Sequence, residues 1–402
     1  MTFKFLSNLE NPDHLLLGPT LWGLQTSGIW QPCKKRVKII YNTIHIMAIL
    51  FVLSQYVELY FIRNDLAMAL KNLSVTMLST VCVVKAGTFI IWQKYWKDIF
   101  NYVSKLEKNQ LYKPDYLTKN TIRKYTEYSR FVTYFYWTLV TATVFSLILA
   151  PLASYLSSFQ NKELGDSGAS SYPEIMSSWV PFDKTQGCGY LVLTLIHVLI
   201  CFYGGGIVAN YDSNAVVLMC FFAGQLKILK INCERLFGNG EEIVSYKEAV
   251  ERIRICHHHH ILLIKYSKVF NSLLSPVMFL YIIICSLMIC ASAVQLTTAG
   301  TTSMQQIWIA EYLIALVAQL FLYCWHSHKV LHMSLQVDSG VYTSAWWSQD
   351  VRIRRSVLLL GGQLKKKVMF TAGPFTDLNI ATFVAILKGS YSYYTLLSKR
   401  GE

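Results

Sequence analysis

The chain has 402 residues, of which 53% are hydrophobic and 15% are charged, and its formal net charge is +14. Soluble domains carry about 25% charged residues, so this composition excludes an ordinary soluble globular protein and favours a membrane protein. The basic residues are dispersed over several loops, which argues against a nucleic-acid partner and for attraction to anionic membrane lipid.

Seven apolar stretches follow one another along the chain, each close to the roughly 20 helical residues that cross a bilayer. They cover residues 39–60, 67–92, 131–152, 190–211, 269–293, 307–326 and 376–397. We therefore predict an all-α membrane protein in which residues 1–402 form one domain with seven transmembrane helices. Residues 1–30 lack the apolar run of a cleavable signal peptide, so the first span is expected to act as the insertion signal.

The segments between the spans alternate in basic content, and this alternation predicts the orientation of the chain. The N-terminal arm and the second, fourth and sixth loops carry 29 lysines and arginines, whereas the remaining loops and the tail carry six. Because basic segments are retained in the cytoplasm, the N-terminus is predicted to be cytoplasmic and the C-terminus extracellular. This orientation is the reverse of that of a G-protein-coupled receptor.

Three of the basic segments, residues 92–130, 213–268 and 326–372, place apolar residues at helical spacing. We expect them to continue the transmembrane helices into the cytoplasm and to form a helical anchor region there. Loop 153–189 is the largest element predicted on the outer side. It is either a lid over an outward-facing cavity or a simple connector.

The outer halves of spans two to six combine apolar and aromatic residues with a few hydroxyl groups, which is the lining expected of a pocket for a small hydrophobic ligand. The candidate pocket residues are Leu73, Met77, Phe145, Ser146, Leu149, Tyr190, Leu193, Thr194, His197, Ile307, Trp308, Glu311 and Tyr312. Each one taken singly also fits the bundle core or a lipid-facing surface. Trp308 and Tyr312 also fit the aromatic belt at a membrane interface.

The last span carries a stripe of small and hydroxyl-bearing residues along one helical face: Thr382, Gly389, Ser392 and Thr395, with Lys388 and Lys399 beside them. A polar stripe in lipid must meet protein or water. Close helix packing is one explanation of the stripe. The other is an aqueous pore lined by one such helix from each of several subunits, for which Leu396 would suit a hydrophobic gate.

The remaining candidates for chemistry are few. Lys85 lies toward the cytoplasmic end of the second span and is expected to snorkel to the surface. The run His257–His260 is interpreted as solvated surface, because the cysteine or carboxylate spacing of a zinc site does not accompany it. The sequence contains no phosphate-binding glycine loop, nucleophile elbow or metalloprotease helix, so no enzyme, metal site or cofactor is predicted.

The block from Ser334 to Leu397 resembles the insect odorant receptor family. The matching positions are Ser334, Tyr342, Trp346, Arg354, Arg355, Gln363, Ala372, Gly373, Phe383 and the run Ser390–Leu397, of which the final run is the most specific. The length, the seven spans and the cytoplasmic N-terminus agree with this family over the whole chain.

The resemblance implies a subunit of a ligand-gated cation channel that assembles with a shared co-receptor into a heteromeric tetramer. It implies that the seventh helices line the pore and that Leu396 occupies the position of the gate, with Ser392, Tyr393, Thr395 and Lys399 as its neighbours. It also implies an odorant site in the outer half of the bundle. Because loop 212–268 is shorter than that of the co-receptor, the chain resembles an odorant-tuning subunit.

The sequence therefore predicts an odorant-tuning subunit in the plasma membrane of an olfactory sensory neuron dendrite, opened by a volatile hydrophobic molecule. The apolar pocket favours a terpenoid or an ester, with one hydrogen bond from Ser146, Thr194 or Tyr312. The alternative is a metabotropic seven-helix chemoreceptor that signals through a cytoplasmic partner and has no pore. A transporter is disfavoured because the halves of the chain show no inverted repeat.

Overall fold

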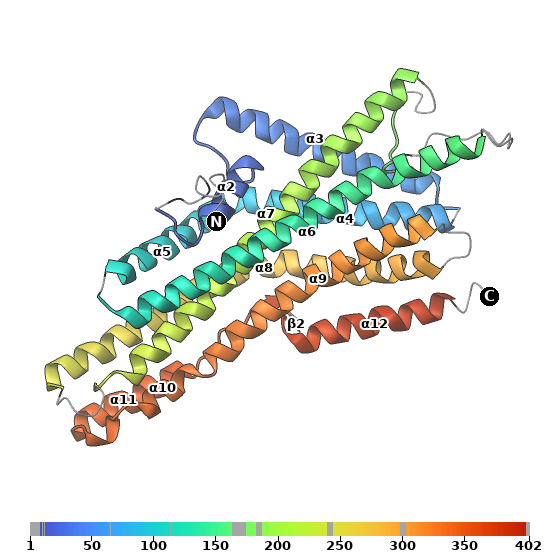
Figure 1. Ribbon diagram of the computed structural model, residues 1–402. Helices are drawn as coiled ribbons and strands as arrows, with labels where there is room; N and C mark the ends of the chain where they lie inside the picture. The colour runs from blue at the N-terminus through green and yellow to red at the C-terminus, as the bar shows by residue number, and fades with distance from the viewer. Residues whose placement is uncertain are drawn as a thin grey trace.

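The computed structural model describes residues 9, 11, 13–64, 66–112, 114–162, 174–181, 187–238, 244–297 and 303–398, which form a bundle of long helices (Figure 1). The elements in chain order are α2 Gly18–Thr26, α3 Lys35–Phe61, α4 Leu66–Ile91, α5 Gln93–Tyr112, α6 Tyr116–Lys162, α7 Gly187–Glu234, α8 Tyr246–Thr297, α9 Ser303–Ser334, α10 Val337–Thr343, η1 Trp346–Ser348, α11 Val351–Leu364, β1 Thr371–Ala372, β2 Thr376–Asp377 and α12 Ile380–Ser398. The all-α prediction is confirmed.

Six of the described helices are long and apolar enough to cross a membrane, namely α3, α4, α6, α7, α8 and α9. They coincide with the first six predicted spans. The seventh predicted span corresponds to α12, which has 19 residues and begins at Ile380 instead of residue 376. The four residues before it belong to a short antiparallel pairing of β1 with β2 and to the turn that starts the helix, where the Asn379 side chain accepts a hydrogen bond from the Thr382 N–H.

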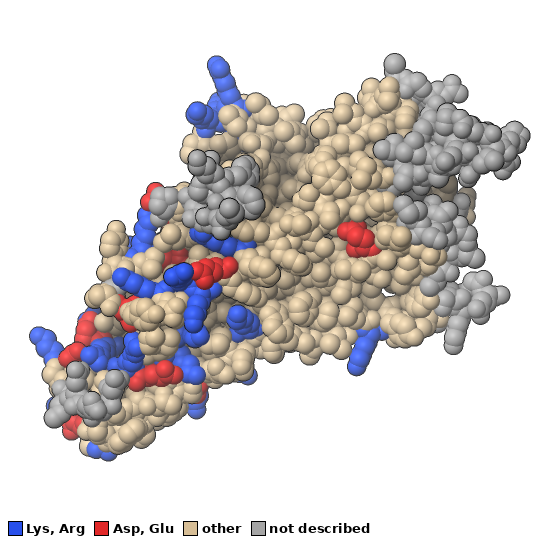
Figure 2. Space-filling view, in the orientation of Figure 1, with Lys and Arg blue, Asp and Glu red and all other residues tan. Residues whose placement is uncertain are grey.

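The anchor region predicted from the three basic segments exists as a helical bundle at one end of the molecule. There α5, α10 and α11 pack beside the ends of α6, α7 and α8 (Figure 1). Figure 2 shows lysine and arginine side chains gathered over this end, while the visible face of the rest of the bundle is almost free of charge. The uncharged part is the surface expected to meet lipid, because charged side chains are expensive in hydrocarbon.

The N-terminal arm contains a feature that the sequence analysis does not anticipate. Helix α2 begins with Pro19 in its first turn, where the missing N–H costs nothing, and it packs against α7 and α6. Leu17, Leu24 and Ile29 are fully buried in the main core.

The run His257–His260 differs from its prediction as solvated surface. His259 and His260 are buried, and only the first two histidines are exposed.

Glycines allow close helix contacts at two levels of the bundle. A Cβ at Gly205 would lie 2.5 Å from Val144, so α6 and α7 approach closely there, as expected for small residues between membrane helices. In the anchor region a Cβ at Gly340 would lie 2.6 Å from the backbone carbonyl oxygen of Lys230, which brings α10 against α7.

Replacing Gly340 by alanine should therefore force α10 away from α7, because a backbone carbonyl cannot rotate aside as a side chain can. Overpacking of this kind costs about 1–3 kcal/mol. Thermal unfolding of the detergent-solubilised protein should show a lower midpoint for G340A. The matched control is G362A on α11, where a Cβ meets no atom within 4 Å. Equal midpoints for the two variants would show that this contact does not stabilise the anchor.

A carboxyl group is buried inside the anchor region, outside the candidate spans. The Glu107 side chain on α5 accepts a hydrogen bond of 2.7 Å from the Tyr125 hydroxyl on α6, and Gln225 on α7 donates to that hydroxyl at 3.3 Å. Burial raises the pKa of Glu107 from its ordinary value near 4.5 to about 7, although the bond from Tyr125 acts in the opposite direction. Glu107 therefore keeps its proton in the folded protein up to about pH 7, where an ordinary carboxyl group is already ionised.

The sign of the resulting pH dependence follows from this raised pKa. The folded state binds a proton that the unfolded state releases, so stability is greatest below pH 4.5 and falls as the pH rises to about 7. The loss amounts to about 3 kcal/mol at most. Glu107→Gln keeps an acceptor for Tyr125 without the titration, so its stability relative to the wild type should rise between pH 5 and pH 7.5 in thermal unfolding. Parallel pH profiles would contradict the assignment.

Candidate functional site

The membrane part of the bundle encloses a cavity of about 590 Å³. Residues from α3, α4, α6, α7, α8 and α9 line it, together with Glu174, Ile175 and Met176 from the described part of loop 153–189. The lining is mainly aliphatic and aromatic, with a few hydroxyl, amide and carboxyl groups. A volume of this size and a wall of this kind are typical of small-molecule sites.

The structure brings four of the residues predicted for the pocket together in the cavity wall. Ser146 comes from α6, and Trp308, Glu311 and Tyr312 come from α9. The three positions on α9 are separated by three or four residues or are adjacent, so they share one side of that helix. The segment 174–176 joins the same wall, which favours the lid over the simple connector for this part of loop 153–189.

The other predicted pocket residues lie outside the cavity lining. Phe145, Leu149 and Ile307 are exposed on the outside of the chain, and Leu193 and His197 are buried elsewhere, with Ser178 bonded to the His197 ring at 3.0 Å. The partly buried members of this set are Leu73, Met77, Tyr190 and Thr194. Their helices are those of the cavity, but the rotation of each helix turns these side chains away from it.

A buried ion pair lies next to two residues of the cavity lining, Tyr136 and Gln319, and corrects the prediction that Lys85 snorkels. The Lys85 side chain is 0% exposed, and its Nζ lies 2.5 Å from the Asp212 Oδ1 on α7. Two buried charges are compatible with a membrane interior when they pair and their remaining hydrogen bonds are satisfied.

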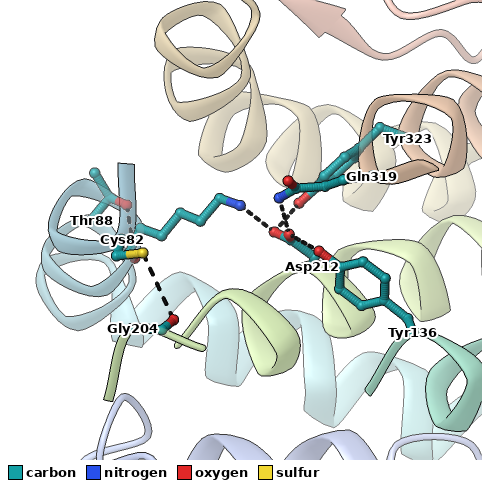
Figure 3. Close-up of polar contacts among 8 residues, drawn as sticks. Cys82, Thr88, Tyr136, Gly204, Asp212, Gln319 and Tyr323 are labelled. Carbon is teal, nitrogen blue, oxygen red and sulfur yellow. Dashed lines mark hydrogen bonds and ion pairs between the residues drawn. The ribbon is translucent and has the colours of Figure 1, made fainter. Parts of the chain in front are cut away.

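Hydrogen bonds from two further helices complete the shell of this carboxylate (Figure 3). The Tyr136 hydroxyl on α6 and the Gln319 amide on α9 donate to Oδ2 at 2.7 and 2.5 Å, and the Tyr323 hydroxyl on α9 donates to Oδ1 at 2.6 Å. Tyr136 and Gln319 also line the cavity. The same two side chains therefore belong to the ligand-sized space and to the charged network beneath it.

Asp212 is not among the residues predicted for a site, because the fourth predicted span ends one residue earlier, at residue 211. The sequence did contain a signal: Lys85 and Asp212 fall toward the predicted cytoplasmic ends of the second and fourth spans, and opposite charges at one depth suggest a pair. Helix α7 in fact continues without a break to Glu234, and it buries Asn210, Asp212, Ser213 and Asn214.

The residues predicted for a pore lie on α12, away from the cavity. Ser392 and Tyr393 are exposed, Thr395 is partly buried, and Lys388 is exposed on the same helix. The side chain of Leu396 and the whole of Lys399 fall outside the described residues. The opposite face of α12 packs on the bundle, where Phe383 meets Phe321 of α9 with ring centroids 5.4 Å apart.

A family model described as 7tm Odorant receptor matches residues 65–391, which include most of the cavity lining, the ion pair and most of α12. The chain belongs to the odorant receptor family. This is a family of receptors and not of enzymes, and membership confirms the prediction that the chain is not an enzyme. Membership also agrees with a membrane protein, as do the six apolar helices.

Similar proteins include insect odorant receptors. Odorant receptor 82a of Drosophila melanogaster is 26% identical over 364 residues, which cover 88% of this chain and 91% of that protein. Odorant receptor Or2 of Anopheles gambiae is 24% identical over 52% of this chain and 56% of that protein. The structure of olfactory receptor OR5 from Machilis hrabei in complex with eugenol matches with a TM-score of 0.82 over 95% of this chain and 97% of that chain, at 18% identity.

Proposed function

We propose that this odorant receptor is a tuning subunit of a ligand-gated, non-selective cation channel, opened when a volatile hydrophobic molecule binds in the 590 Å³ cavity. The partner in this proposal is an insect odorant co-receptor in a heteromeric tetramer. The place of action is the plasma membrane of an olfactory neuron dendrite, with the N-terminus inside. The observation that carries the proposal is a largely apolar, ligand-sized cavity among the helices that are apolar enough to cross a membrane.

Helix α9 supplies a physical route from the cavity to the last helix. It lines the cavity with Trp308 and Tyr312, bonds to Asp212 through Gln319 and Tyr323, and contacts α12 through Phe321. A ligand shifts the channel toward its open state only through a difference in affinity between the two states. Movement of α9 as a unit would provide that difference, because the helix is continuous over 32 residues.

The exposed face of α12 supports a pore made by several subunits. Lys388, Tyr391 and Tyr393 lie on a surface that the rest of this chain leaves uncovered. A lysine in the middle of a membrane helix needs water or a neighbouring subunit. Both are supplied if four such helices surround an aqueous pathway.

The proposal is tested by recording currents from cells that express this chain with and without a co-receptor, under a panel of volatiles. We expect cation current evoked by at least one volatile, only when the co-receptor is present, and retained in excised patches without nucleotides. A response that needs soluble cytoplasmic factors would instead support the metabotropic receptor. Silence to every volatile, with both subunits at the surface, would contradict the channel.

The gate assignment has its own test at Leu396. Replacing this residue by serine should raise the current in the absence of odorant, because a polar ring no longer dewets a narrow pore. The measurement is the basal current relative to the maximal odorant-evoked current, with surface expression determined in parallel. An unchanged basal fraction would place the gate elsewhere.

A further inference from the structure

Three buried polar atoms in the wall of the cavity have no hydrogen-bond partner among the described residues. They are the Glu311 Oε2, the Gln295 Nε2 and the Tyr312 hydroxyl oxygen. Buried polar groups in proteins are nearly always bonded, so each exception asks for an explanation. Three unbonded polar atoms in one ligand-sized cavity indicate that a bound ligand supplies their hydrogen bonds.

The other oxygen of Glu311, Oε1, is also not fully hydrogen-bonded. Its Oε1 lies 2.9 Å from the Thr143 hydroxyl, but that hydroxyl also lies 3.0 Å from the Leu139 carbonyl oxygen and has only one proton to donate. The described lining of the cavity contains no lysine, arginine or histidine. The carboxyl group therefore faces the cavity without a cation, either ionised and lacking donors or protonated and lacking an acceptor.

We propose that the cavity selects alcohols, meaning ligands that carry one hydroxyl group on an otherwise apolar skeleton. This inference rests on the proposed function and names the ligand class of the same site. A hydroxyl donates to the Glu311 Oε2 when the carboxyl is ionised and accepts from it when it is protonated. In either state its oxygen also accepts from the Gln295 amide or the Tyr312 hydroxyl.

Other volatile classes satisfy these atoms less completely. An ester, ketone or ether has acceptors only and leaves an ionised Glu311 without a donor. A protonated amine has donors only and leaves the Gln295 Nε2 without an acceptor. A carboxylate would meet two carboxyl groups, because Glu174 also lines the cavity. Of the two classes that the apolar residues alone suggest, a terpenoid still fits when it carries a hydroxyl group, whereas an ester is disfavoured.

The test compares alcohols with their matched derivatives on the complete channel, meaning this chain with its co-receptor. Octanol, geraniol and benzyl alcohol are each applied beside the methyl ether, amine, hydrocarbon and carboxylic acid of the same skeleton. For at least one skeleton, the half-maximal concentration of the alcohol should be lower than that of its ether and amine by about tenfold or more, because a polar site rejects analogues that leave it unbonded.

Variants then assign the preference to Glu311. In Glu311→Leu the alcohol should fall to the potency of its ether, whereas Glu311→Gln, which still offers a donor and an acceptor, should keep most of the preference. Glu174→Gln is the comparison, since this carboxyl lines the same cavity and already has another interaction. A preference that survives Glu311→Leu, or is lost only in Glu174→Gln, would overturn the assignment.

The two proposals fail in different ways. Currents evoked by volatiles with equal potency for alcohols and ethers would leave the channel in place and overturn the alcohol selectivity. Absence of any evoked current would overturn the proposed function. Binding is also measured without gating, as stabilisation of the purified protein against heat by each volatile. Stabilisation by alcohols above that by ethers, abolished in Glu311→Leu, would support the selectivity in that case, and equal stabilisation would overturn it.

Discussion

Replacing Asp212 by asparagine is expected to remove most of the receptor from the cell surface. The variant leaves the fully buried Lys85 ammonium without a counter-charge. Removing one partner of a buried ion pair costs about 3–5 kcal/mol, which approaches the whole folding stability of many proteins, about 5–15 kcal/mol. Surface biotinylation and thermal unfolding in detergent measure the effect.

A double variant separates the loss of charge from the loss of hydrogen bonds. In Lys85→Met combined with Asp212→Asn no charge remains. The Tyr136 and Tyr323 hydroxyls bond to different oxygens of the carboxylate, so the amide oxygen of residue 212 still accepts from one of them and its amide nitrogen donates to the other. We expect the double variant to recover surface expression relative to Asp212→Asn alone. If the single variant is as abundant as the wild type, the pair does not support the fold.

Filling the cavity from α7 is expected to lower the potency of the odorant strongly without harming the fold. Gly204 lines the cavity, and a Cβ built there has one neighbour, the Cys82 Sγ at 3.7 Å, which is ordinary contact. A phenylalanine at this position would extend into the space that we propose for the ligand. Steric conflict of about 1–3 kcal/mol lowers the potency of the ligand by about tenfold to a hundredfold.

The control for this experiment lies two residues away on the same helix. Gly206 is absent from the cavity lining, and a Cβ there meets no atom within 4 Å. Gly206→Phe should therefore reach the surface and respond with wild-type potency, whereas Gly204→Phe should reach the surface and respond only at much higher concentrations. Equal potency of the two variants would place the odorant outside this cavity.

The fold of this chain was largely predictable because hydrocarbon imposes a length and a composition on every crossing. The first six apolar stretches correspond to α3, α4, α6, α7, α8 and α9, and the amphipathic segments form the anchor region. The start of α12 was misplaced by four residues, since local turn geometry and the Asn379 cap decide it and apolar content does not.

The cavity lies between helices that the sequence predicts as spans, but few of the predicted side chains line it. Ser146 lines it, and Phe145, the next residue on the same helix, is 48% exposed. Neighbouring residues on a helix point about 100° apart. The rotation of six helices about their own axes therefore decides the lining, and tertiary packing sets that rotation.

The Lys85–Asp212 pair is a second feature that the sequence alone does not predict. Both residues were visible in the sequence at similar depth, but a contact between residues 127 positions apart depends on which helices are neighbours. The family resemblance supplied the overall arrangement and not this contact. The sequence also could not predict that the Gln295 Nε2 and the Glu311 Oε2 lack hydrogen-bond partners, because only the structure shows which groups are bonded.

The length of α7 has a consequence for the outline of the receptor on a cell. Its 48 residues make a rod about 72 Å long, whereas the hydrocarbon layer is only about 30 Å thick. If α7 crosses the hydrocarbon once along its axis, with α8 of similar length beside it, these two helices would extend roughly 40 Å beyond one membrane surface. An array of these receptors would keep other membranes and large scaffolds at that standoff, a height that atomic-force imaging of a supported bilayer can read.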